Sequence, residues 1–274
     1  MKMSGRIALS VGVLVCLTAF GSVVGAQNKL YKEMNRSDQT AFVSEQARNV
    51  TRQLSGVEYG LTAEFVLEIQ KSVDYYSSRI DNNGGDRLGK GDARFVFDRG
   101  QAVAPSLIRV FKARNLSPLF GLYIPLVESE YVNIQTPNQV GSTGVFQFIP
   151  QTGQRFGLSS ADLLDVEKSA DAAASYISAL LLKFNTSSTK EALALLSYNR
   201  GEGAVERDVA AIIKEDNKGC SICALTAARY QLDKSFQSES VYYVPRFLAG
   251  AIIGENPQVF GLKTKPLSSL DANQ

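Results

Sequence analysis

The chain has 274 residues, and 45% of them are hydrophobic, which is ample for one or two folded domains. It contains 29 Lys and Arg, 27 Asp and Glu, and no histidine. The absence of histidine excludes Ser-His-Asp and Cys-His nucleophile systems, histidine bases and histidine-ligated zinc. Acid–base chemistry near neutral pH then falls to Glu, Asp, Lys, Tyr or Cys. The balanced charge gives no sign of a nucleic-acid partner, which requires a concentrated basic patch.

Residues 1–26 have the pattern of a secretory signal peptide. Lys2 and Arg6 precede a mostly apolar run, and Val24-Gly25-Ala26 is a suitable small-residue cleavage site. An uncleaved membrane anchor is the alternative, because the apolar run is about long enough to span a bilayer. Either interpretation places the protein in the periplasm or cell envelope.

Residues 27–100 are predicted to form a helical N-terminal extension. A weak helical period runs through residues 42–50, and Thr62 can cap a stronger helix whose apolar stripe includes Phe65 and Tyr76. The segment 81–86 (DNNGGD) is a loop. It lacks the alternating ligands and closing Glu of an EF-hand, so we expect no metal site there. A further helical pattern covers residues 92–113.

The segment from Ser117 to Glu128 predicts a buried helix with a carboxylate at its end. Ser117 can cap this helix, Pro118 suits its first turn, and no charge occurs from Leu119 to Val127. Desolvation and the negative end of the helix dipole both disfavour the charged form of Glu128. Glu128 is therefore a candidate general acid. The alternative is that Glu128 only marks the point where the helix reaches the surface.

The rest of the chain is predicted to be helical apart from one short stretch. Residues 145–148 and their approach look extended, so we expect at most one small hairpin. Further helices are predicted at 169–184, at 190–199 after a capping box at 188–191, at 202–214 and at 237–253. The predicted fold class is mainly α.

Four motifs occur in an order that resembles the lytic murein transglycosylases of the soluble (SLT) type. They are ES at 128–129, GSTGVFQFIPQT at 141–152, LSYNRGEG at 196–203 and SESVYYVP at 238–245. The last motif is closest to the membrane-bound lytic transglycosylase D group. The resemblance implies a lysozyme-like α domain over residues 101–262, followed by a tail at 263–274. It also implies that peptidoglycan glycan strands are the partner.

The resemblance also assigns roles to residues of this chain. Glu128 would act first as acid and then as base on the MurNAc–GlcNAc bond, giving a 1,6-anhydro product without water or a cofactor. Phe146 and Phe148 alternate along an extended segment, so only one can face the groove, and Phe146 is our candidate. The expected substrate-binding residues are Ser142, Phe146, Gln147, Tyr198, Asn199 and Tyr243. For Asn199 the alternative is a left-handed helix cap, and for Tyr243 it is core packing.

Glycosidases normally use two carboxylates. Glu130 should point to a different helix face from Glu128, and no acidic residue occurs between Tyr131 and Arg155. A transglycosylase needs only one such Glu. Two alternatives remain: a hydrolytic goose-type lysozyme relative, and a catalytically weak or inactive peptidoglycan-binding component of an envelope assembly. We see no LysM repeat, so wall affinity must come from the groove, an anchor or an envelope partner protein.

Cys220 and Cys223 are expected to form a local disulfide, because the chain is predicted to be secreted. Free or redox-active thiols are the first alternative, but no thioredoxin-like strand–helix pattern surrounds the pair. A metal site is the second alternative, but a two-Cys zinc site lacks its other ligands.

Overall fold

The computed structural model describes residues 29–213 and 219–271, so the predicted signal peptide lies outside the described residues. The structure is 67% helical and the described residues contain no sheet, which confirms the mainly α fold. Of the hairpin expected near residue 145, only isolated antiparallel bridges are present, Ile134 with Gly144 and Thr143 with Phe148. Within residues 29–213 and 219–271, none of the helices is both long and apolar enough to cross a membrane.

The described residues form α-helices joined by short loops and 3-10 turns. The α-helices are α1 (Arg36–Ser55), α2 (Ala63–Ser78), α3 (Ala93–Ala113), α4 (Pro118–Ser129), α5 (Pro150–Arg155), α6 (Val166–Lys183), α7 (Lys190–Arg200), α8 (Glu202–Ile212), α9 (Ser221–Ala227), α10 (Lys234–Ser238) and α11 (Tyr243–Glu255). The 3-10 turns are η1 (Tyr31–Glu33), η2 (Asp162–Leu164), η3 (Arg229–Gln231), η4 (Ser240–Tyr242), η5 (Pro257–Phe260) and η6 (Leu267–Ser269).

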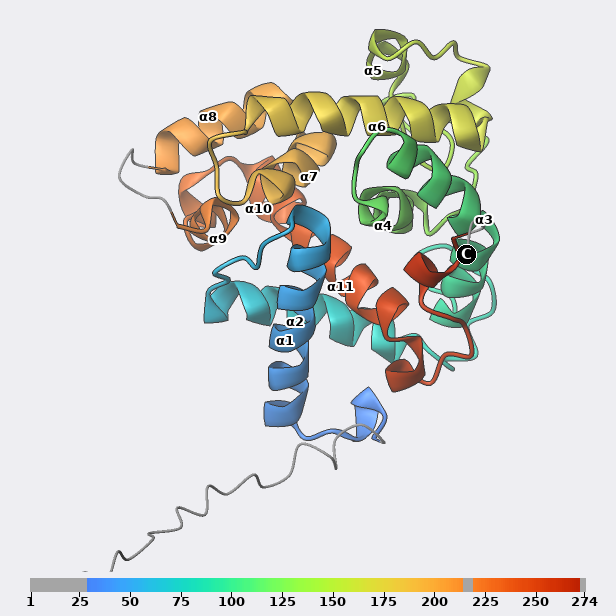
Figure 1. The fold of residues 1–274 in the computed structure, drawn as a ribbon, viewed down its shortest axis with the longest axis vertical. Helices are drawn as coiled ribbons and strands as arrows, with labels where there is room; N and C mark the ends of the chain where they lie inside the picture. The colour runs from blue at the N-terminus through green and yellow to red at the C-terminus, as the bar shows by residue number, and fades with distance from the viewer. Residues whose placement is uncertain (1–28, 214–218, 272–274) are drawn as a thin grey trace, which may run out of the picture.

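Helix α4 is the central helix of the fold. Every residue from Leu119 to Leu126 is buried, as its apolar sequence predicts. Helices α3 and α11 pack directly against it, and α11 runs through the middle of the molecule (Figure 1). Two glycines allow this close approach. A Cβ at Gly121 would lie 2.4 Å from Cδ2 of Phe111, and one at Gly250 would lie 2.9 Å from Cδ2 of Leu126.

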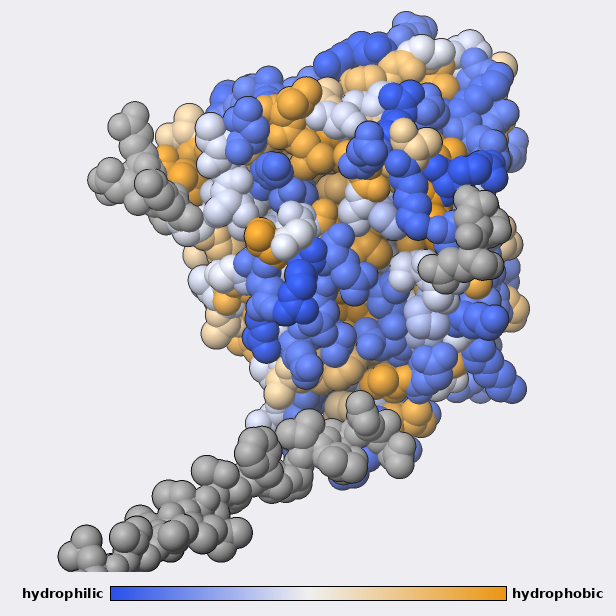
Figure 2. Space-filling model, in the orientation of Figure 1, coloured by the Kyte–Doolittle hydropathy of each residue, from blue (hydrophilic) through white to orange (hydrophobic). Residues whose placement is uncertain are grey.

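The helices before residue 100 share the core of the rest of the chain. Helices α1 and α2 pack against α11, and their buried side chains belong to the same hydrophobic cluster as those of α4. The boundary predicted between residues 100 and 101 falls inside α3. The predicted tail also contributes, because Leu267 is buried and η6 contacts α3 and α4. Hydrophilic side chains cover most of the face seen in Figure 2, where apolar ones occur in separate groups.

A buried ion pair fastens the loop after α2 to the end of α4. Nη1 and Nη2 of Arg79 lie 2.5 and 3.1 Å from the two carboxylate oxygens of Glu130, and both side chains are less than 10% exposed. The N–H of Gly89 donates to the same carboxylate at 2.9 Å, and Nε of Arg79 donates to the carbonyl of Gly91 at 2.9 Å. Glu130 is thus a structural residue, held by Arg79 and by the backbone of Gly89.

The structure confirms the predicted cap of α2 but contradicts the one predicted for α7. Thr62 caps α2 by accepting the N–H of Phe65 at 3.3 Å, as predicted. The predicted capping box at 188–191 is wrong. Thr189 makes no side-chain cap bond, and Glu191 instead accepts a hydrogen bond of 2.8 Å from the hydroxyl of Tyr59. Glu191 therefore bonds Tyr59, which is distant in sequence, instead of the backbone at the start of its own helix.

Two further differences concern helix ends. Ser117 occupies the N-cap position of α4, but its hydroxyl donates to the carbonyl of Gln53 instead of capping the helix. The helix predicted over 237–253 is interrupted, because α10 ends at Ser238 and α11 begins only at Tyr243. The interruption places Glu239 and η4 between the two helices.

The two cysteines lie at the start of α9. A disulfide joins Cys220 to Cys223, whose Cα atoms are 5.2 Å apart. Cys220 is also the N-cap residue of α9, and its sulfur accepts the N–H of Cys223 at 3.2 Å. The bridge therefore encloses only the first turn of a short helix and links no distant segments.

We predict that Arg79→Ala lowers the free energy of unfolding by about 3 kcal/mol or more, because it leaves the buried Glu130 carboxylate without its counter-charge. Urea unfolding would measure this change. The control is Lys183→Ala, which removes an exposed pair with Glu206 and should cost less than about 1 kcal/mol. Equal losses in the two variants would contradict a special role for the buried pair.

Candidate active site

Glu128 lies in the last turn of α4, where this buried helix reaches a cleft of about 470 Å³. The walls of the cleft come from the 138–152 segment, from α6, from the junction of α7 and α8, and from the break before α11. Glu128 itself is only partly exposed. The cleft therefore brings together side chains from four separate parts of the sequence around one carboxyl group.

The surroundings of Glu128 favour its protonated form. Burial raises the pKa of its carboxyl group to about 7 from an ordinary value of 4.5. The hydroxyl of Tyr243 donates a hydrogen bond of 2.7 Å to Oε1, which opposes part of this rise in the pKa. The negative charge of Glu239 adds to the rise. The result is a carboxylic acid that can still donate a proton at neutral pH.

The segment after Glu128 is shaped by residues with left-handed backbone conformations. Gly144 has a φ of +75°, and a Cβ there would lie 2.2 Å from the carbonyl oxygen of Leu163. Gln147 has a φ of 48°, and its Nε2 donates to the carbonyl of Gly144 at 2.7 Å. Ser129 ties this segment to α4 by donating to the carbonyl of Val145 at 2.8 Å. Ser142 and Gln147 both line the cleft.

The structure corrects the expectation for Phe146. Its ring is buried and stacks on Phe111 with the ring centroids 6.5 Å apart, whereas Phe148 lines the cleft. The alternation along the segment allowed only one of the two to face the cleft, and α3 supplies the core partner that selects Phe146 for the interior. Tyr198 also lines the cleft, and its hydroxyl donates to the carbonyl of Phe146 at 2.9 Å. Phe146 thus supports the site through its backbone.

Asn199 lies inside α7, and the helix ends one residue later with Gly201 in a positive-φ conformation at 81°. The alternative role of Asn199 as a left-handed cap is therefore wrong. Asn199 lines the cleft, and its Oδ1 is buried with no hydrogen-bond partner in the part of the chain that the structure describes. Such an oxygen can accept a hydrogen bond from an amide or hydroxyl group of a substrate.

Two further carboxylates, neither of them predicted from the sequence, line the cleft. Glu202 accepts a hydrogen bond of 2.8 Å from the hydroxyl of Tyr176 and pairs with Arg155 at 3.0 Å. Burial raises its pKa, but hydrogen bonds from its own backbone N–H, Tyr176 and Arg155 outweigh burial and lower it. Glu239 is exposed in the break between α10 and α11. Glu202 and Glu239 both lie in sequence motifs of the SLT resemblance. A continuous helix was predicted over 237–253, so the turn that places Glu239 in the cleft was not expected.

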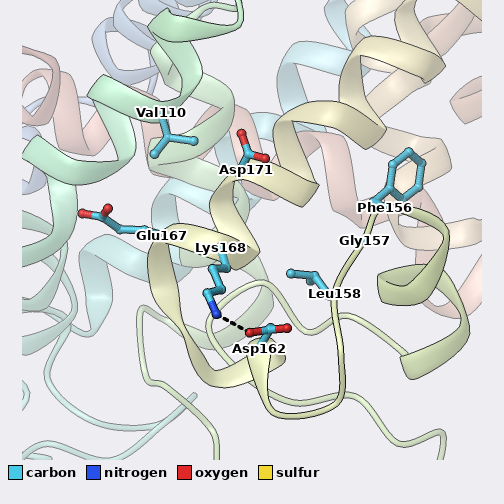
Figure 3. A pocket seen from close by; sticks show the side chains of 8 residues that line it. All are labelled: Val110, Phe156, Gly157, Leu158, Asp162, Glu167, Lys168 and Asp171. Atoms are coloured by element: carbon cyan, nitrogen blue, oxygen red, sulfur yellow. Dashed lines mark hydrogen bonds and ion pairs between the residues drawn. The ribbon is translucent and has the colours of Figure 1, made fainter.

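A second group of carboxylates surrounds a different hollow, of about 400 Å³, where α3, α6 and the loop after α5 meet (Figure 3). Asp162 pairs with Lys168 at 2.5 Å, and Asp171 pairs with Arg114 at 2.6 Å. Glu167 pairs with Arg109. Every carboxylate there is neutralised by a cation, and the described residues contain no cluster suited to a metal ion. This hollow therefore offers no acid for catalysis.

Comparison with known families agrees with this site. Residues 108–218 match the family model described as "Transglycosylase SLT domain". This part of the chain is similar to a transglycosylase SLT domain. Such a domain implies lytic transglycosylase activity on peptidoglycan. The matched range includes Glu128, Ser142, Gln147, Tyr198 and Asn199, and it ends before Glu239 and Tyr243. A search of the curated proteins finds no match to this chain.

We predict that the stability of the wild type falls relative to Glu128→Gln as the pH rises. Because folding raises the pKa of Glu128, the native protein holds this proton more tightly than the unfolded chain does. The resulting stabilisation is complete below the ordinary value of 4.5 and is lost as the pH reaches about 7. Urea unfolding of both proteins across this range would measure the difference. A difference that does not change with pH would contradict the raised pKa.

Proposed function

We propose that this protein is a peptidoglycan lytic transglycosylase that cleaves the MurNAc–GlcNAc β-1,4 bond with Glu128 as its catalytic residue. The observation that carries the proposal is the buried Glu128 carboxyl, with a pKa of about 7, at the edge of the 470 Å³ cleft of an SLT domain. No cofactor is needed, because the chemistry consists of proton transfers and one exchange of C–O bonds.

The proposed reaction uses the same carboxyl group twice. Glu128 first donates its proton to the glycosidic oxygen, and the C1–O bond to the leaving GlcNAc breaks with assistance from the acetamido group of MurNAc. The Glu128 carboxylate then accepts the proton of the C6 hydroxyl while that oxygen bonds to C1. The 1,6-anhydro ring closes, Glu128 is protonated again and no water is consumed.

The residues around Glu128 would hold the sugar and the acid in position. The hydroxyl of Tyr243 fixes one oxygen of Glu128 by a 2.7 Å hydrogen bond, which leaves the other oxygen to face the substrate. Ser142 and Gln147 would hydrogen-bond sugar substituents. The unpaired Oδ1 of Asn199 suits the N–H of an acetamido group. Tyr198 would contact the scissile sugar from the same wall.

The protein would work in the cell envelope, where its substrate occurs. The signal-like residues 1–26 support secretion to that compartment. The motif at 238–245 supports a relation to the membrane-bound lytic transglycosylase D group.

A hydrolytic lysozyme-like reaction is the second candidate, because Glu239 lines the same cleft as Glu128. In that reaction Glu239 would act as the nucleophile or would activate a water molecule. The product distinguishes the two reactions. Hydrolysis leaves a reducing end that is heavier by one water than the 1,6-anhydro end. A wall-binding protein without turnover would instead bind sacculi and release nothing.

We predict that Glu128→Gln lowers the rate of muropeptide release from purified sacculi by at least about a hundredfold, the usual contribution of a general acid. Mass spectrometry should show 1,6-anhydro ends in the wild-type products. The matched control is Glu191→Gln, because Glu191 is also buried and also accepts a tyrosine hydroxyl hydrogen bond, at 2.8 Å, but lies outside the cleft. Cleavage by Glu128→Gln at the wild-type rate would exclude the proposed role.

We predict that kcat/KM falls as the pH rises through about 7, because Glu128 then loses the proton it must donate. In Glu239→Gln this falling limb should move to lower pH, since the charge that raises the Glu128 pKa is removed. Cleavage should persist in this variant, with anhydro products. Complete loss of cleavage in Glu239→Gln would instead favour the two-carboxylate reaction.

A further inference from the structure

Glu128 also lines a second cleft, of about 260 Å³, that shares no other lining residue with the first. Its walls come from Tyr75 and Tyr76 of α2, from the 88–89 loop, from the end of α4 and from Arg246 of α11. Most of these walls lie outside the matched SLT range of 108–218. Glu128 therefore lies between the two clefts, so a long linear substrate lying over Glu128 would enter both.

One wall of this second cleft is apolar, exposed and firmly held. Tyr75 and Leu88 are 47% and 50% exposed, although both are large apolar side chains. The hydroxyl of Tyr75 donates to the carbonyl of Gly89 at 2.6 Å, and Gly89 is itself bonded to the Glu130 carboxylate at 2.9 Å. The guanidinium of Arg79 lies 5.3 Å from the centroid of the Tyr75 ring. A fixed surface of this kind suits packing against a sugar ring.

The lining of this cleft also includes a cation without a carboxylate partner among the described residues. Arg246 is exposed and lies over the ring of Tyr242 at 5.8 Å, and no carboxylate of the described residues lies within ion-pair distance of it. Glu130, which lines the same cleft, is already neutralised by Arg79 at 2.5 Å. The positive charge of Arg246 is therefore available to a ligand, and a guanidinium binds carboxylates through paired hydrogen bonds.

We propose that this second cleft binds the portion of the peptidoglycan strand across the scissile bond from the first cleft, and that Arg246 binds a carboxylate on that portion. The inference rests on the proposed function, which supplies the strand and its position over Glu128. Two groups provide this chemistry: the carboxylates of the peptide stem, and the lactyl carboxylate that is free wherever the stem has been removed.

The test measures strand affinity without turnover. Glu128→Gln in the full chain, alone and combined with Arg246→Gln, would be titrated by calorimetry with three kinds of soluble glycan strand. The first kind carries peptide stems, the second has had its stems removed by an amidase, and the third has its carboxylates converted to amides. We expect Arg246→Gln to weaken binding of carboxylate-bearing strands roughly tenfold, the low end for a charge-assisted hydrogen bond, and to leave binding of the amidated strands unchanged.

Two variants control for other effects of the substitution. Arg207→Gln removes an exposed arginine of α8 that has no ion pair among the described residues and lines neither of the two clefts, so it should bind strands like its parent. Arg246→Lys keeps the charge and should recover part of the affinity. An equal loss in Arg207→Gln would show a general charge effect and overturn the inference, as would unchanged affinity in Arg246→Gln.

The strand that loses affinity identifies the carboxylate. Loss with stem-bearing strands alone assigns it to the peptide, and loss that persists after the stems are removed assigns it to the lactyl group. The affinity measurement is also independent of the reaction. If wild-type protein releases no muropeptides but Arg246→Gln still weakens binding, the proposed reaction fails and the cleft assignment stands. If the wild type cleaves but Arg246→Gln does not weaken binding, the proposed reaction stands and the assignment of the second cleft fails.

Discussion

The proposed function places one constraint on the structure: a carboxyl group must be withdrawn from water and still meet a polymer at the surface. Helix α4 satisfies this constraint because its residues from Leu119 to Leu126 are buried on every side and only its last turn opens to the clefts. The apolar packing of α3 and α11 around α4 therefore does more than stabilise the fold. It sets the desolvation that raises the pKa of Glu128.

The chain must also turn sharply directly after the acid, and the N-terminal helices secure that turn. Glu130 and Tyr131 both have positive φ angles, of 49° and 61°, which are unfavourable for side chains of this size. The Arg79 ion pair and a hydrogen bond of 2.9 Å from Nε of Arg99 to the Glu130 carbonyl hold the turn in place. The matched SLT range contains the acid, but α2 and its loop are needed to fix the backbone that follows it.

The sequence predicted what depends on local pattern. The mainly α fold, the buried α4 and the cap at Thr62 all follow from periodicity and residue type, and the structure has each of them. The errors have a common cause, which is a partner distant in sequence. Glu191 bonds Tyr59 instead of closing a capping box, and Phe146 turns inward because α3 offers Phe111. No periodicity could reveal the break at Glu239 or the bond between Arg79 and Glu130, since both depend on tertiary packing.

The raised pKa of Glu128 is a requirement that the two candidate reactions of the cleft share. When two carboxylates divide the work of a glycosidase, the acid and the nucleophile need pKa values that lie well apart, so that one is protonated while the other is charged. A single group that first gives and then takes a proton needs a value close to the working pH, because both states must be accessible. The value of about 7 for Glu128 meets the second requirement, and it equally suits the acid of a two-carboxylate pair. Glu202 does not compete for this role, because Arg155 and Tyr176 hold its pKa below its ordinary value. The charge on Glu239 helps to hold the Glu128 pKa near neutrality, so a transglycosylase gains from this neighbour even when it takes no part in bond making.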